Sequence, residues 1–138
     1  MTALKKRGIL YLMVAVTVFS VWIPAFASDD NWGYKFSLKT DNWNSYSDGR
    51  YRQTTNTANP WKVEMTYHSR GKTAYATYWL ARTGDKEQVS STRDVTCKTG
   101  PLKTAAWAGA SMVTVSLGAE NYANQTADVS GFWEEETF

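Results

Sequence analysis

The only histidine and the only cysteine of the 138-residue chain are the side chains best suited to covalent chemistry. His68 as the base for a Cys97 thiolate is the pairing that a Cys-His hydrolase or transpeptidase uses, and it requires both side chains to lie within hydrogen-bond reach. We expect a different role for each of them. His68 falls on the polar face of an alternating segment, and an isolated cysteine is usually a buried apolar thiol. The sequence therefore favours a non-enzymatic protein with no catalytic residue.

Other catalytic and metal-binding patterns lack required members. A Ser-His-Asp triad would depend on His68, and the segment 109–113 around Ser111 lacks the closing glycine of a nucleophile elbow. The acidic run 134–136 lies next to the C-terminus, where a solvated or edge-blocking role is more usual than glycoside cleavage. Residues 41–45 are rich in oxygen ligands but lack the spacing of an EF-hand loop. We therefore expect turns there, and neither a metal nor a cofactor.

Three aromatic residues in a polar stretch without clean alternation are the candidate ligand-binding residues, namely Trp43, Tyr46 and Tyr51. Exposed aromatic clusters usually mark an interaction site, and a row of such rings can stack against sugar rings. Aromatic side chains in such loops can instead fold back as anchors of the core. The sequence leaves both interpretations open, and they differ in whether replacing Trp43 with Ala unfolds the domain.

Strands must position these residues, because apolar and polar residues alternate with a period of two along much of the chain. The clearest cases are residues 34–38, 61–68, 112–117 and 126–133. Residues 75–81 contain consecutive apolar side chains, as expected for a central strand covered on both faces. Gly, Pro, Asn and Asp separate the segments at intervals of about ten residues. We predict an all-β fold, a single small antiparallel β-sandwich of about seven or eight strands.

The core of this sandwich should be unusually aromatic. After residue 27 the chain has no isoleucine and four leucines, but six tryptophans, seven tyrosines and three phenylalanines. One aromatic side chain can bury roughly 150–250 Å², so a few of them replace a larger number of aliphatic residues. We expect the aromatic side chains to hold the fold together.

Residues 1–27 have the parts of a secretory signal peptide, with cations at Lys5-Lys6-Arg7, an apolar stretch, and small residues before a cleavage site after Ala27. An uncleaved membrane anchor is the alternative, although the apolar stretch is short for a bilayer span. The remaining domain, 28–138, carries 12 basic and 13 acidic groups, so the net charge of +2 on the full chain does not indicate a nucleic-acid partner. We predict a secreted, extracellular protein without a stable membrane anchor, which the cell wall could retain.

Three segments carry a family resemblance: YRQTTNTANPWKV at 51–63, LGAEN at 117–121, and VSGFWEEET at 129–137. Together with the leader, they resemble a family of small secreted proteins from Gram-positive bacteria that is known only as a domain of unknown function. The resemblance covers essentially all of 28–138 and implies no catalytic or binding residue. A looser likeness connects the chain to lactococcin-type bacteriocins, which are also secreted, compact, β-rich and full of Trp, Tyr, Gly and Asn.

These observations lead us to expect a secreted, non-enzymatic bacterial protein that interacts with a component of the cell envelope or with a protein target. Bacteriocin-like antagonism is one form that this interaction could take. The alternative is a cell-wall glycan or carbohydrate-binding module that uses Trp43, Tyr46 and Tyr51.

Overall fold

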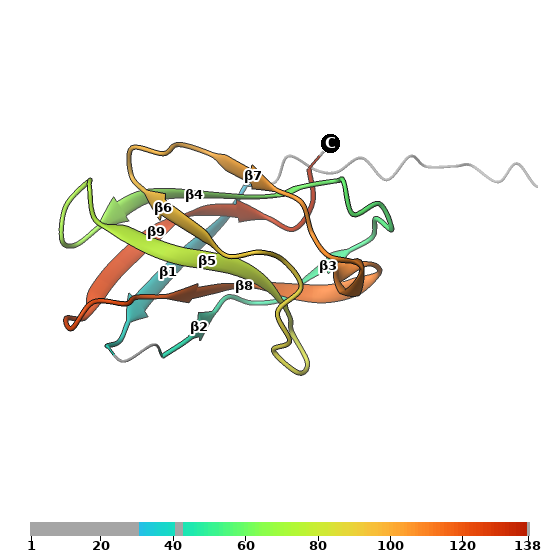
Figure 1. Ribbon diagram of the computed structural model, residues 1–138, viewed down its shortest axis with the longest axis horizontal. Coiled ribbons are helices and arrows are strands. Elements are labelled where there is room, and N and C mark those ends of the chain that lie inside the picture. The colour runs from blue at the N-terminus through green and yellow to red at the C-terminus, as the bar shows by residue number, and fades with distance from the viewer. Residues whose placement is uncertain (1–30, 41–42, 138) are drawn as a thin grey trace, which may run out of the picture.

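The computed structural model describes residues 31–40 and 43–137, which fold into two packed antiparallel sheets (Figure 1). The predicted all-β sandwich is confirmed. The described residues form nine strands. Three of them are only two or three residues long, and pattern analysis does not detect them. The signal peptide predicted for 1–27 lies outside the described residues. No helix in the described part of the chain is long and apolar enough to cross a membrane.

One sheet has four strands. Their order across the sheet is β1 (Trp32–Leu38), β9 (Ala127–Glu134), β4 (Trp61–His68) and β7 (Leu102–Thr104). All three pairings are antiparallel. Burial alternates along β1 and β9, because one face of each strand lies against the core and the other faces solvent.

The other sheet has five strands. Their order is β2 (Ser45–Tyr46), β8 (Val113–Glu120), β5 (Tyr75–Arg82) and β6 (Arg93–Thr96), with β3 (Arg50–Arg52) also paired to β8. Strand β5 is buried on both faces from residue 76 to residue 81, as its apolar run predicts. The short 3-10 helix η1 (Ala108–Ala110) precedes β8.

The core between the sheets is aromatic at its centre. Trp61, Trp133 and Tyr78 are among its largest fully buried side chains. The Tyr34 and Tyr78 hydroxyls lie 3.0 Å apart across the two sheets, and their rings meet edge to face at 5.5 Å. Seven other aromatic side chains are exposed, so only part of the aromatic content serves the core.

Strand β4 contains an irregularity that exchanges the faces of its last two side chains. Its pairing with β9 shifts between Met65 and Tyr67. As a result, Tyr67 is 54% exposed and His68 is 4% exposed. The prediction that His68 lies on the polar face is wrong, because a one-residue slip reverses every side chain that follows it.

The acidic run near the C-terminus is largely buried, so the solvated role, one of the two that the sequence suggested, is wrong. Residues 134–137, which we call the C-terminal strap, run back along the segment 52–62. Lys62 forms an ion pair with Glu134 at 3.2 Å, and the Glu136 carboxylate accepts hydrogen bonds from the backbone N–H groups of Gln53 and Thr54. Glu134 is 1% exposed and Glu136 is 9% exposed. Backbone donors and a lysine make this burial tolerable for the carboxylates.

Candidate functional site

The three aromatic residues singled out by the sequence do not form one platform. Trp43 is 67% exposed, Tyr51 is 50% exposed and Tyr46 is half-buried, so none of them is a fully buried core anchor. Tyr46 pairs with Gly118 of β8, whereas Tyr51 pairs with Thr114. Four residues along a strand correspond to about 14 Å. Of the three, only Tyr46 belongs to the hollow described below.

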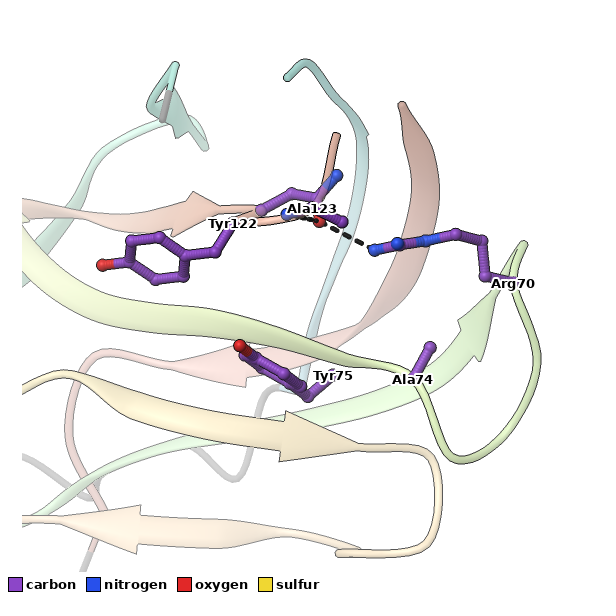
Figure 2. A pocket seen from close by; sticks show the side chains of 6 residues that line it. Arg70, Ala74, Tyr75, Tyr122 and Ala123 are labelled. Carbon is purple, nitrogen blue, oxygen red and sulfur yellow. Dashed lines mark hydrogen bonds between the residues drawn. The ribbon is translucent and has the colours of Figure 1, made fainter. Parts of the chain in front are cut away.

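Two of the hollows in the described part of the chain lie along the outer face of the five-stranded sheet. The first, which we call the tyrosine slot, measures about 220 Å³ and lies between the β4–β5 turn and the loop after β8. It is lined by Arg70, Ala74, Tyr75, Asn121, Tyr122 and Ala123. Figure 2 shows both tyrosine rings on one side of it and the Arg70 side chain on the other.

The second hollow, which we call the aromatic pocket, measures about 200 Å³ and is centred on Trp79. Its lining consists of Asn44, Tyr46, Trp79, Lys86, Gln88, Thr92 and Glu120. An indole, a phenol ring and several amide, hydroxyl and charged groups therefore converge on one concave surface. The lining is therefore mainly polar, with an aromatic ring face for stacking and several hydrogen-bonding groups around it.

Gly118 determines where the Trp79 indole lies. The two residues are register partners on β5 and β8, and a Cβ atom on Gly118 would approach the indole to 2.4 Å. Only glycine leaves room for the ring to lie across the neighbouring strand. Tyr46, the partner of Gly118 on the other side, meets the indole edge to face, with ring centroids 6.2 Å apart. Trp79 is 4% exposed and Tyr46 is half-buried, so the indole supports the floor of the pocket from below and the Tyr46 ring is the more accessible of the two.

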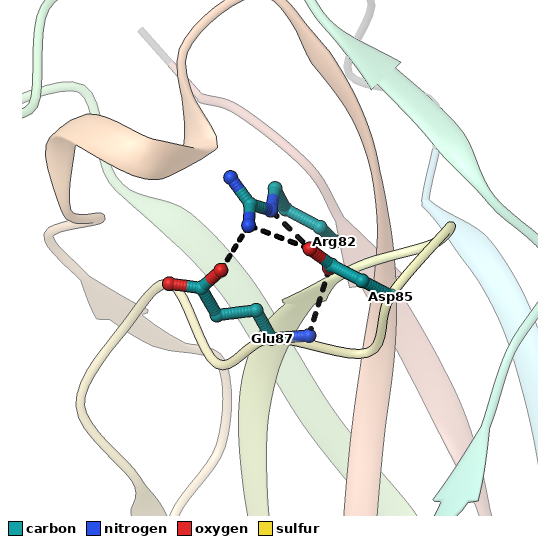
Figure 3. Close-up of polar contacts among 3 residues, drawn as sticks. All are labelled: Arg82, Asp85 and Glu87. Carbon is teal, nitrogen blue, oxygen red and sulfur yellow. Dashed lines mark hydrogen bonds and ion pairs between the residues drawn. The ribbon is translucent and has the colours of Figure 1, made fainter.

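The wall of the aromatic pocket is formed by the loop after β5. Lys86 adopts a left-handed backbone with φ of 60° and holds its ammonium 4.9 Å from the centre of the Tyr46 ring. Figure 3 shows how this loop is braced, since the Arg82 guanidinium bonds to the carboxylates of both Asp85 and Glu87. The hydrogen bond from Arg82 keeps the pKa of Asp85 below its usual value. These ion pairs position the strand-to-strand loop and, with it, Lys86.

The polar rim of the pocket is held in place by local hydrogen bonds. Gln88 donates from Nε2 to the Ser90 carbonyl at 2.7 Å, and the Tyr46 hydroxyl accepts from Asn44 Nδ2 at 3.4 Å. Glu120 accepts a hydrogen bond from the Tyr122 hydroxyl, and this bond raises the pKa of Tyr122 to about 12. Glu120 therefore connects the aromatic pocket to the tyrosine slot.

The contacts of His68 and Cys97 do not support a catalytic pairing of the two side chains. His68 Nδ1 accepts a hydrogen bond from the Arg70 N–H at 3.1 Å, and the buried Nε2 has no hydrogen-bond partner. Burial and the Arg70 charge lower the pKa of His68, and the nearby Tyr75 backbone only partly opposes them. Cys97 is half-buried against the core. In the described part of the chain no hydrogen bond joins the two side chains. No group of three His, Cys, Asp or Glu residues there could hold a metal ion.

Sequence reasoning missed most of the aromatic pocket. Trp79 was expected in a central strand, and it lies in one. Nothing in the sequence, however, shows that its ring crosses a glycine of the neighbouring strand. Lys86 looks like an ordinary turn residue. One usable signal was present, because Leu117 to Asn121 already carried the family resemblance and supplies Gly118, Glu120 and Asn121 to the two hollows.

The fold and its two outer hollows define a small β-sandwich with a concave polar-aromatic face. A sequence model described as a protein of unknown function (DUF2712) matches residues 19–137. The chain belongs to this family, and the predicted membership in a family of unknown function is confirmed. Neither a curated protein nor a solved structure matches the chain.

Proposed function

We propose that this protein is a secreted, non-enzymatic binding module that recognises carbohydrate on the bacterial cell envelope through the aromatic pocket. The observation that carries the proposal is the half-buried Tyr46 ring, set edge to face against the 4% exposed Trp79 indole and surrounded by hydrogen-bonding side chains. A sugar presents an apolar face of C–H groups and an edge of hydroxyls. The aromatic floor suits the first and the polar rim suits the second.

The side chains of the rim favour a sugar over other ligand classes. Asn44 and Gln88 each offer both donors and acceptors, Lys86 donates and Glu120 accepts, so hydroxyl groups of either orientation find partners. Among the residues that the structure describes, Lys86 is the only cation that lines this pocket. A nucleic-acid site would need several cations that follow the phosphates. A largely apolar ligand would leave the rim groups without water or partners.

Retention on isolated Gram-positive cell wall, with soluble wall polysaccharide as competitor, tests the proposal. The wild-type protein should be retained and the competitor should release it. Tyr46→Ala removes the accessible ring of the floor and should lower retention about fivefold, since an aromatic contact contributes about 1 kcal/mol. Tyr67→Ala is the control, because Tyr67 is 54% exposed and belongs to the four-stranded sheet.

An absence of competable retention would overturn the proposal. Equal losses in Tyr46→Ala and Tyr67→Ala would place the site elsewhere. The non-enzymatic part is tested by Cys97→Ala, which should leave retention and competition unchanged. Bacteriocin-like antagonism stays a prediction, which a growth-inhibition assay with the same protein tests.

A further inference from the structure

Arg70 is the feature of the tyrosine slot that the carbohydrate proposal does not use. Its side chain is exposed, and no carboxylate among the described residues lies within ion-pair distance of it. Its guanidinium donates from Nη2 to Asn121 Oδ1 at 2.7 Å (Figure 2). The remaining N–H groups of the planar fork stay available at the slot.

Asn121 is well suited to hold this guanidinium in place. It is 2% exposed, and its Nδ2 donates to the Gln125 carbonyl at 2.6 Å. Its Oδ1 also accepts from the Ala123 N–H at 3.2 Å. The amide is thus fixed by its own loop before Arg70 binds to it. A guanidinium held in this way loses less rotamer freedom when it binds a carboxylate.

The slot and the aromatic pocket adjoin each other at Glu120. Glu120 lines the pocket and accepts from the Tyr122 hydroxyl of the slot. Tyr75 and Trp79 lie four residues apart on β5, which corresponds to about 14 Å along the strand. This separation exceeds one sugar ring, so one ligand reaches both hollows only if it is a chain of several sugars.

We infer that the protein binds a linear glycan along the outer face of the five-stranded sheet, with a carboxylate-bearing sugar in the tyrosine slot against Arg70. The inference rests on the proposed carbohydrate function and specifies its ligand class. The Tyr46 ring, supported by the buried Trp79 indole, receives one sugar of the chain. Tyr75 and Tyr122 receive another, and the Arg70 fork binds its carboxylate.

Calorimetric titration with two probes tests the acidic part of the inference. The first probe is peptidoglycan glycan strands freed of peptide by an amidase, in which alternate sugars carry a lactyl carboxylate. The second is the neutral hexamer of N-acetylglucosamine. At low salt the acidic strands should bind about tenfold more tightly, the effect of one hydrogen-bonded charge pair. Arg70→Gln should remove this preference, whereas Lys72→Gln, a control in the same turn, should keep it.

Glycans of two lengths test the second part of the inference, that one ligand spans both hollows. The N-acetylglucosamine hexamer should bind more tightly than the dimer, because the dimer cannot span both hollows. Tyr122→Ala should remove that difference, and the equally exposed control Tyr67→Ala should keep it. Equal affinities for acidic and neutral strands, or for dimer and hexamer, would overturn the inference while the carbohydrate proposal stands. Retention on cell wall without binding of either probe would also overturn the inference alone. The absence of wall retention would overturn both.

Discussion

Arg52 donates a hydrogen bond from Nη1 to the carbonyl oxygen of Glu135 at 2.6 Å, which joins residues 83 positions apart. The same guanidinium donates to the Asn59 carbonyl at 2.6 Å and is 1% exposed. Burial lowers the pKa of Arg52, and the charges of Glu136 and Glu135 oppose that shift. The C-terminal strap and the segment 52–62 are thereby joined through one buried cation. Two of the three segments that carry the family resemblance meet here.

The first prediction concerns this cation. Arg52→Ala leaves several buried carbonyl groups without their donor and should lower the free energy of unfolding by about 3 kcal/mol. Chemical denaturation followed by tryptophan fluorescence measures the change. Lys72→Ala, at an exposed position, should change it by less than about 0.5 kcal/mol. Similar small effects from both variants would show that the strap is not a stabilising element.

Gly118 gives a test of the aromatic pocket that removes none of its lining side chains. Gly118→Ala brings a methyl group into the Trp79 indole and should displace the ring, at a cost of about 2 kcal/mol in stability. Retention on cell wall should fall with it. Gly33→Ala is the matched control, since nothing lies within 4 Å of its added Cβ. If Gly118→Ala binds like the wild type, the indole is not the floor of the site.

Trp43 distinguishes the two interpretations that the sequence left open. Because its side chain is 67% exposed, Trp43→Ala should change the free energy of unfolding by less than about 0.5 kcal/mol. Trp43 directly precedes Asn44 of the pocket rim. A ligand chain that extends past the rim should therefore bind less tightly to this variant. Denaturation and calorimetry on the same sample separate the two effects. A large loss of stability would instead make Trp43 a core anchor.

Stability should depend on pH through His68, the only histidine. Its pKa in the fold is lowered by burial and by Arg70, so below the usual value near 6.5 the unfolded chain binds the proton more readily than the folded one. The free energy of unfolding should therefore fall as pH decreases from about 7.5 to about 5.5, by at most about 1.4 kcal/mol per pH unit. His68→Gln should remove this slope. An unchanged slope in that variant would assign the effect to other groups.

The sequence predicts the architecture better than the site, for physical reasons. Alternation with a period of two locates β1, β4 and β9, because each has one buried face. It fails at Tyr67 and His68, where the register shift reverses the faces and no local signal announces it. It also misjudges Glu136, since the N–H groups that accommodate its carboxylate come from residues more than 80 positions away.

The candidate site depends on contacts between strands that are distant in sequence. Tyr46 was predicted from its polar surroundings, and it lies in the pocket. Trp79 was not predicted as a site residue, because its role arises from the pairing of β5 with β8 and from the absence of a side chain on Gly118. Cross-strand register is a property of the folded sheets, and a single sequence does not contain it.

A titration of isotope-labelled protein with amidase-treated glycan strands, followed by NMR, tests the central claim most directly. The indole N–H of Trp79 and the backbone signals of Lys86, Gln88 and Glu120 should shift together and give one dissociation constant. Signals of Tyr67 and Phe132, exposed on the four-stranded sheet, should stay in place. Shifts confined to the four-stranded sheet, or no shifts on a protein that the cell wall retains, would contradict it.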